Sequence, residues 1–146
     1  MKKIALTAAI IIAGAATSQA QTFDVGTKNI TVTTAIVTGY NIPIAVSYEQ
    51  GIVDFGGANK LGIGGYLLTG GSYTFIAPEC NYHYVGFEQF DLYAGVRFGY
   101  CSKNNGGKPY STANIGANYY FNPSWAINAE VGSGLGWLNL GATFKF

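Results

Sequence analysis

Apolar and polar residues alternate along most of this chain, and its last nine residues, LNLGATFKF, show the pattern clearly. Leu138, Leu140, Ala142, Phe144 and Phe146 occupy every second position, with polar or small residues between them. Successive side chains of a β-strand point to opposite faces of the sheet, so this spacing predicts a strand with one apolar face. The apolar face of that strand reaches the last residue.

Eight segments of this kind follow one another, and clusters of Gly, Asn, Pro or Ser separate them. No stretch with a helical period competes with them. Most are close to the roughly 9–11 residues that a tilted strand needs to cross a lipid bilayer. The predicted strands are 28–38, 41–50, 59–69, 73–85, 90–101, 109–121, 124–132 and 135–146.

The two faces of these predicted strands differ in chemistry. One face carries no charge and holds residues such as Ile44, Ile76 and Ile115. A small closed barrel cannot bury so many large apolar side chains while it exposes Gly and Asn, so we expect the apolar face to look at lipid. The pattern thus predicts an all-β fold, an eight-stranded antiparallel up-and-down transmembrane β-barrel. The charged residues of the opposite, lumen face are Glu49, Lys60, Glu79, Asp91, Arg97, Glu130 and Lys145.

The composition agrees with a membrane barrel. Hydrophobic residues make up 49% of the chain and charged residues only 10%, where soluble domains carry roughly 25% charged residues. After residue 20, no apolar run approaches the roughly 18 residues that a membrane helix needs. Without Lys2 and Lys3 the chain has six basic and seven acidic side chains, a balance that excludes the basic surface typical of nucleic-acid binding.

The first twenty residues, MKKIALTAAIIIAGAATSQA, have the organisation of a secretory signal peptide. A basic start is followed by an apolar stretch at 4–16 and by the small residues Ser18 and Ala20 around Gln19. We therefore expect cleavage near Ala20. The prediction is a signal peptide at 1–20 and a single barrel domain at 21–146.

Aromatic residues fall at similar heights on several predicted strands. If the chain enters the barrel from the periplasm, the second, fourth, sixth and eighth strands all end on that side. Aromatic belts mark the interfaces of membrane barrels, so these residues predict a periplasmic girdle. Its members are Tyr48, Tyr82, Tyr84, Tyr119, Phe121 and Trp125.

Several short motifs carry a family resemblance: Ser47-Tyr48-Glu49, Tyr82-His83-Tyr84, Asp91-Leu92-Tyr93, Tyr119-Tyr120-Phe121 and the terminal Phe144-Lys145-Phe146. Over its whole mature length the chain resembles the small OmpA/OmpX-type outer-membrane β-barrels of the porin family. The resemblance implies insertion among the lipids of the outer membrane of a Gram-negative-type bacterium. It also implies that the terminal strand is a signal for the barrel-assembly machinery, carried by Leu138, Leu140, Phe144 and Phe146.

Charged residues on the lumen face need partners, because an isolated buried charge costs several kcal/mol. A turn near Glu88 sets Glu79 opposite Arg97, and we predict direct contact between these two side chains. We predict that the lumen holds an ion-paired plug, with separate solvation of each charge as the alternative. The plug consists of Glu49, Glu79, Arg97, Glu130 and Lys145.

The sequence shows no enzyme or cofactor signature. His83 is the single histidine, and the Tyr84 and Val85 that follow it supply no nucleophile of the kind found in lipid hydrolases of the outer membrane. The glycine clusters at 62–65 and 132–134 do not open a helix, so a nucleotide-binding loop is not indicated. We expect no catalytic activity, cofactor or metal site.

Cysteine and proline positions give two further expectations. The predicted register places Cys80 opposite Val96 and Cys101 opposite Phe75, on different faces, so we predict two free thiols. Pro78 lies inside a predicted strand, where it removes one hydrogen bond of the ladder, and we expect a β-bulge there.

These observations favour a small integral outer-membrane barrel with a side-chain-filled polar lumen, structural or of undefined role, and not an open pore. The alternatives are a periplasmic barrel that binds a small apolar ligand, and surface recognition through the outer loops. The outer connections, near 39–40, 70–72, 102–108 and 133–134, are all short. Nothing in the sequence identifies a ligand.

Overall fold

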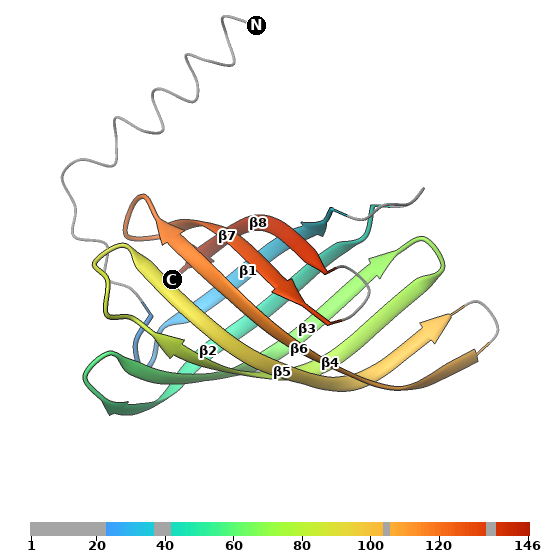
Figure 1. Ribbon diagram of the computed structural model, residues 1–146, viewed down its shortest axis with the longest axis horizontal. Coiled ribbons are helices and arrows are strands. Elements are labelled where there is room, and N and C mark those ends of the chain that lie inside the picture. Colours follow the sequence, from blue (N-terminus) through green and yellow to red (C-terminus); the bar gives the residue numbers. More distant parts are fainter. Residues whose placement is uncertain (1–22, 37–41, 104–105, 134–136) are drawn as a thin grey trace, which may run out of the picture.

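Eight antiparallel strands form one closed barrel in the computed structural model, which describes residues 23–36, 42–103, 106–133 and 137–146 (Figure 1). Each strand pairs with the next and β8 pairs with β1, so the sheet has no free edge. The predicted eight-stranded antiparallel barrel is confirmed. The strands are β1 (Lys28–Ala35), β2 (Ile44–Gly56), β3 (Asn59–Gly70), β4 (Tyr73–Tyr84), β5 (Phe90–Lys103), β6 (Gly106–Tyr120), β7 (Trp125–Gly132) and β8 (Leu138–Lys145).

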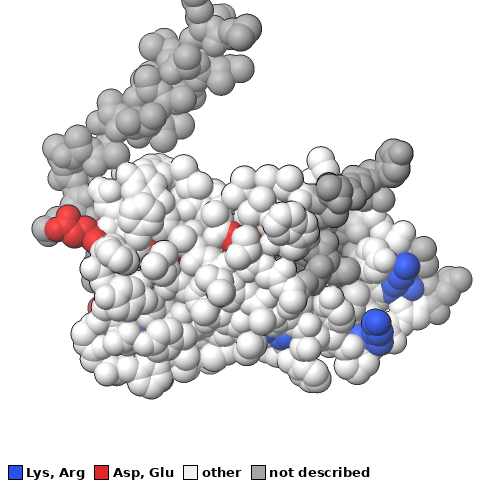
Figure 2. Space-filling model, viewed as in Figure 1, with Lys and Arg blue, Asp and Glu red and all other residues white. Residues whose placement is uncertain are grey.

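Side-chain direction follows the alternation seen in the sequence. The outward residues Ile76, Phe98 and Ile115 are 61%, 68% and 64% exposed, whereas the inward Asn81 and Asp91 are buried. Figure 2 shows few charged atoms along the middle of the barrel wall on the side drawn. Among the residues described, there is no helix with the length and apolar character of a membrane span.

The second strand is longer than predicted. β2 continues past Gly51 to Gly56, whereas the predicted strand ends at residue 50. Register shifts after Gly51 and after Asp54 let its pairing with β3 continue. We expected the strand to end near Gly51. Instead, β-bulges accommodate the two register shifts, and the β2–β3 pairing continues as far as Gly56 and Asn59. The turn itself is made at Gly56 and Gly57, which have φ values of 95° and 59°.

Pro78 is accommodated without the predicted β-bulge. The β4–β5 ladder pairs Ile76 with Tyr100 and Glu79 with Arg97, and the two pairs share the same register. The pairing is interrupted over two residues instead of being shifted by an extra one. Pro78 has no N–H to donate, and an interruption removes the need for that donor without changing which side chains face the lumen.

The structure confirms the prediction for the two cysteines, whereas the signal-peptide boundary stays a prediction. Cys80 pairs with Val96 and Cys101 pairs with Phe75, and both thiols are free, as predicted. The signal peptide predicted at 1–20 and the connection at 39–40 lie outside the described residues, as do parts of the connections near 102–108 and 133–134.

The lumen is polar over only part of its length. Toward the β3–β4 and β5–β6 turns, which project beyond β7 and β8 in Figure 1, its inward side chains are mainly apolar and aromatic. This segment packs as a small core, whereas the sequence predicted a polar lumen throughout. Its members are Ala45, Tyr66, Leu68, Phe75, Ala77 and Cys101, with Tyr73 and Tyr110 packed against them.

Candidate functional site

Polar side chains from every strand meet inside the barrel. They occupy alternate positions of strands whose other face is apolar, so the period of the strand alone directs them inward. Their burial makes the lumen the candidate site of this protein. The buried polar residues are Asn29, Thr33, Glu49, Lys60, Glu79, Asn81, His83, Asp91, Arg97, Asn114, Asn118, Asn128, Glu130, Asn139 and Thr143.

Arg97 is the centre of the first charged group. Its Nε donates to Glu79 Oε2 at 2.9 Å, so the contact predicted between these residues is present. Its Nη1 and Nη2 donate to Glu130 Oε1 and Oε2 at 2.8 and 2.7 Å. The guanidinium carbon also lies 3.9 Å from the centroid of the Tyr66 ring. A paired fork of this kind fixes the orientation of both groups as well as their charge.

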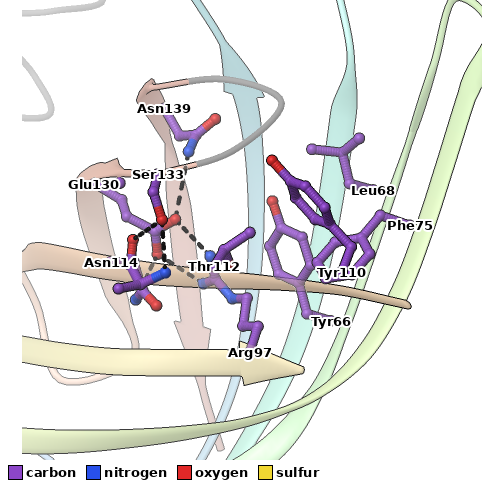
Figure 3. Close-up of a pocket in the computed structure, with 12 residues that line it drawn as sticks. Tyr66, Leu68, Phe75, Arg97, Tyr110, Thr112, Asn114, Glu130, Ser133 and Asn139 are labelled. Carbon is purple, nitrogen blue, oxygen red and sulfur yellow. Dashed lines mark hydrogen bonds and ion pairs between the residues drawn. The ribbon is translucent and has the colours of Figure 1, made fainter. Parts of the chain in front are cut away.

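The Glu130 carboxylate accepts hydrogen bonds from further side chains as well as from Arg97 (Figure 3). Tyr93 Oη donates to Oε2 at 3.1 Å, and Asn114 Nδ2 donates to the same oxygen at 3.2 Å. Asn139 Nδ2 donates to Oε1 at 3.3 Å. A buried carboxylate that accepts from a guanidinium, a phenol and two amides has the partners it needs for its charge to remain inside.

His83 is the centre of a second charged group. Its Nδ1 lies 2.7 Å from Asp91 Oδ1, and its Nε2 lies 2.9 Å from Glu49 Oε1. Both ring nitrogens of His83 can donate hydrogen bonds only when the ring is in the imidazolium form. Because each nitrogen faces a carboxylate oxygen, the two carboxylates favour this form. Asn81 Nδ2 donates to Glu49 Oε1 at 3.0 Å, and Asn118 Nδ2 donates to Asp91 Oδ2 at 3.1 Å.

Amide and hydroxyl groups connect the two charged groups. Asn128 Nδ2 donates to Tyr93 Oη at 2.9 Å and to Asn118 Oδ1 at 2.8 Å. Tyr93 reaches Glu130 of the first group, and Asn118 reaches Asp91 of the second. The lumen is thus crossed by one connected hydrogen-bond network, which resists the exchange of single partners for water.

The structure places two residues of the predicted plug in the lumen but outside the group around Arg97. Glu49 contacts His83 and not Arg97 in the ion pairs of the described residues. Lys145 lies six residues along β8 from Asn139, about 20 Å at the usual rise per residue, while Asn139 is the strand partner of Glu130. The Lys145 ammonium instead lies 5.0 Å from the centroid of the Tyr120 ring.

His83 and Asp91 are the part of the site that the sequence did not identify as a pair. Asp91 has lumen parity, and the short β4–β5 turn pairs His83 with Tyr93, two residues from Asp91. That diagonal neighbour relation could have indicated the contact, because side chains at such positions are within reach of each other.

The mouth of the barrel beside the β2–β3 turn carries its own ion pairs. Lys60 Nζ lies 2.6 Å from Asp54 Oδ2 and 3.4 Å from Asp24 Oδ1. Asp54 lies beyond the predicted spanning segment 41–50, and the hydrogen bond from Lys60 holds the pKa of its carboxyl below the usual value. These contacts tie the segment before β1 to the next hairpin.

Two small cavities lie inside the barrel, within the part of the chain that the structure describes. One of about 20 Å³ lies between the aromatic side chains of Tyr66 and Tyr110 and the Arg97–Glu130 pair (Figure 3). A second cavity of about 20 Å³ is lined mainly by polar residues of the lumen, among them Glu49 and Glu79. Each volume is that of about one water molecule, so neither accommodates an organic ligand. No cluster of three or more His, Cys, Asp or Glu suited to a metal occurs among the described residues.

The predicted girdle residues other than Tyr48 lie at or near the ends of β4, β6 and β7. Tyr48 lies inside β2, eight residues before its last residue, Gly56. Tyr48, Tyr82, Tyr84 and Trp125 are exposed, and Tyr119 is half-buried against Phe90, with ring centroids 5.0 Å apart. Phe121 is also half-buried, in the turn between β6 and β7.

The terminal strand presents its apolar residues outward. Leu140, Phe144 and Phe146 are exposed, and Leu138 is half-buried at the start of β8. Phe144 packs against Trp125 with ring centroids 4.9 Å apart, and the Phe146 N–H donates to the Lys28 carbonyl at 3.0 Å. The last residue is thus held in the wall of the barrel.

Comparison with known proteins supports the fold of this chain but identifies no family for it. No known family and no curated protein matches this chain. A de novo designed transmembrane β-barrel is 21% identical and has a TM-score of 0.65, over 86% of this chain and 100% of that one. Ail, the attachment invasion locus protein of Yersinia pestis, is 15% identical with a TM-score of 0.49, over 84% of this chain and 99% of that one. At such identities, the similarity to the designed barrel shows the shared fold of a closed eight-stranded barrel.

Proposed function

We propose that this protein is a small integral barrel of the bacterial outer membrane, closed along its lumen and structural or of undefined role. One observation carries the proposal: large apolar side chains cover the outside while charged side chains are buried inside. A barrel in water would have the opposite arrangement, because exposed apolar surface is unfavourable and a buried charge needs partners. A bilayer makes the apolar outer face favourable, and the ion pairs of the lumen give the buried charges their partners.

The filled lumen supports a role other than solute passage. Arg97 joins β5 to β4 and β7 across the interior, and the cavities beside it have the volume of about one water molecule. An eight-stranded barrel has an interior that side chains alone can fill. The same small volumes disfavour the alternative of a periplasmic barrel that binds an apolar ligand.

The remaining parts of the proposal follow the sequence. A signal peptide at 1–20 would direct export, with cleavage near Ala20. Outer-membrane lipids would contact the exposed face, and the barrel-assembly machinery would read the strand that carries Leu140, Phe144 and Phe146. We propose no catalytic activity, because His83 is fully buried between two carboxylates.

Fractionation and gel mobility test the proposal together. The full chain should remain with the outer membrane after osmotic shock and carbonate washing, and detergent should release it. Unheated samples should migrate differently from boiled samples on a gel, as a folded barrel resists the detergent. Release by osmotic shock as a soluble protein with no heat-dependent mobility would support the periplasmic ligand-binding alternative instead.

A further inference from the structure

Phe23 lies in the lumen although it precedes the first strand. It is only 1% exposed, and its ring stacks on that of His83, with centroids 3.8 Å apart and planes at 13°. β1 begins five residues later, at Lys28. The ring is therefore not part of the barrel wall. It enters the lumen from the mouth next to the β2–β3 turn.

Two glycines make the space that this ring occupies. A Cβ at Gly62 would lie 2.8 Å from Phe23 Cζ, and a Cβ at Gly51 would lie 3.3 Å from Phe23 Cε1. The first of these distances is too short for any real contact, and the Gly51 Cβ would also overlap the Asp24 carbonyl group. A Cβ at Gly62 would also overlap Glu49 Oε1, so a side chain there would displace the Phe23 ring, the Glu49 carboxylate or both. A side chain at Gly51 would displace the Asp24 backbone.

The backbone around Phe23 is fixed by hydrogen bonds to the barrel. The Gly26 N–H donates to the Gly51 carbonyl at 2.9 Å, and the Gly51 N–H donates to the Thr27 carbonyl at 2.9 Å. The Thr27 N–H donates to the Asp24 carbonyl at 3.0 Å, which closes a turn with Gly26 at a φ of 85°. The Asp24 carboxylate completes the attachment by its ion pair with Lys60.

We propose that Phe23 and Asp24 form an N-terminal plug, which is distinct from the ion-paired plug predicted above. A slot bounded by Gly51, Gly62 and His83 binds the aromatic ring, and the ring closes this mouth of the lumen. Assigning the mouth to the periplasmic side rests on the proposed function, whereas the closure itself does not. The ring covers one face of the His83 imidazole, which touches Asp91 and Glu49 at its edge.

Such a cover has a physical consequence for the charged group beneath it. The contacts of His83 with Asp91 and Glu49 strengthen when water is kept away, because the effective dielectric constant falls. The face of an aromatic ring also attracts an imidazolium by the cation–π interaction. The plug therefore holds His83 in its place as well as closing the mouth.

The single histidine of the chain makes the plug directly observable. The full chain, purified without a histidine tag and labelled with ¹⁵N-histidine, gives ring signals from His83 alone. In the unaltered protein, folded in detergent micelles, we expect ring N–H signals protected from exchange with water and ring protons shifted upfield by the stacked phenyl group. Phe23→Ala should remove the shift and accelerate N–H exchange about tenfold or more, because local opening sets the exchange rate.

Matched variants separate the plug from general loss of structure. Phe87→Ala removes another phenyl ring from the β4–β5 connection, where it is exposed, and should leave the His83 signals unchanged. Asp24→Asn removes the ion pair with Lys60 but keeps the ring, and should accelerate exchange by a smaller factor. Gly62→Ala keeps Phe23 but fills its slot, and should reproduce the loss of the upfield shift. Because the Glu49 carboxylate also lies against Gly62, the ring-proton shift and not the N–H exchange is the readout for this variant.

The results distinguish failure of the plug from failure of the proposed function. Protected and shifted His83 signals in Phe23→Ala, with the heat-dependent gel mobility of a folded barrel, would overturn the plug and leave the membrane role intact. Rapid exchange of the ring N–H groups in the unaltered folded protein would also overturn it. If Phe23→Ala does not fold, Asp24→Asn and Gly62→Ala decide the question by the same signals.

Discussion

Arg97 faces Glu79 directly across the β4–β5 ladder, yet it makes more hydrogen bonds to Glu130 on β7, the next strand but one from β5. One nitrogen of the guanidinium donates a hydrogen bond to Glu79, and the other two donate to Glu130. The contact with Glu79, which follows from the strand pairing, therefore has fewer hydrogen bonds than the contact with Glu130. The contact across the lumen orients the group and connects β5 to a strand that is not its neighbour.

Substitution of Arg97 should destabilise the barrel strongly. Arg97→Ala leaves the Glu79 and Glu130 carboxylates buried without their cation, and should lower the free energy of unfolding by about 3–5 kcal/mol. Denaturant titration of the barrel in lipid vesicles, followed by tryptophan fluorescence and gel mobility, measures the loss. Lys108→Ala, an exposed position near the β5–β6 turn, is the control and should have little effect.

Double-mutant cycles should rank the two partners of Arg97. We expect a coupling free energy of about 2 kcal/mol between Arg97 and Glu130, and a smaller one between Arg97 and Glu79. The reason is the paired fork to Glu130, which Glu79 lacks. Simple additivity in both cycles would show that the charges are solvated separately, which was the alternative for a wet lumen.

Removal of Asp91 should affect the second charged group. Asp91→Ala takes away the acceptor of His83 Nδ1 and of Asn118 Nδ2, and two buried donors without partners should cost about 2–4 kcal/mol of unfolding free energy. The same titration measures it. Glu88→Ala removes an exposed carboxylate from the β4–β5 connection and should leave stability almost unchanged; an equal loss in both variants would contradict a special role for the buried group.

The parts of this site that the sequence could predict are those set by short-range pairing. Period-two alternation identifies which residues face inward, and a short turn near Glu88 fixes the register that brings Glu79 to Arg97. Glu130 reaches Arg97 across the lumen from β7, and no turn relates those two strands directly. Contacts of that kind depend on the curvature of the closed barrel, which alternation does not encode.

Phe23 shows a second limit of pattern reading. It precedes the first strand, so no alternation assigns it to a face, and its position depends on a turn around Gly26. The glycines that receive its ring could be recognised only as small lumen residues. Their specific role follows from a segment that the strand pattern does not include.

The lumen should not conduct steadily. Planar bilayer recordings of the full chain should show no stable open-channel current, because hydrogen bonds and ion pairs join strands that are not neighbours through the interior. A larger porin reconstituted in the same bilayers provides the positive control. A large, steady current that depends on the amount of inserted protein would contradict the closed lumen.

Substitution of Ile115 tests which solvent the outer face contacts. Ile115 is 64% exposed near the middle of the predicted sixth span, and its strand partners are Ala94 and Val131. In a bilayer, Ile115→Arg places a charge near the midplane and should lower the unfolding free energy by about 2–4 kcal/mol. Ser102→Arg, at the exposed end of β5, is the matched control and should cost about 0–1 kcal/mol. In a water-soluble barrel the new charge at residue 115 would replace an exposed apolar side chain and would be tolerated as well as the one at residue 102. Equal stability of the two variants in vesicles would therefore argue that the apolar face does not contact lipid.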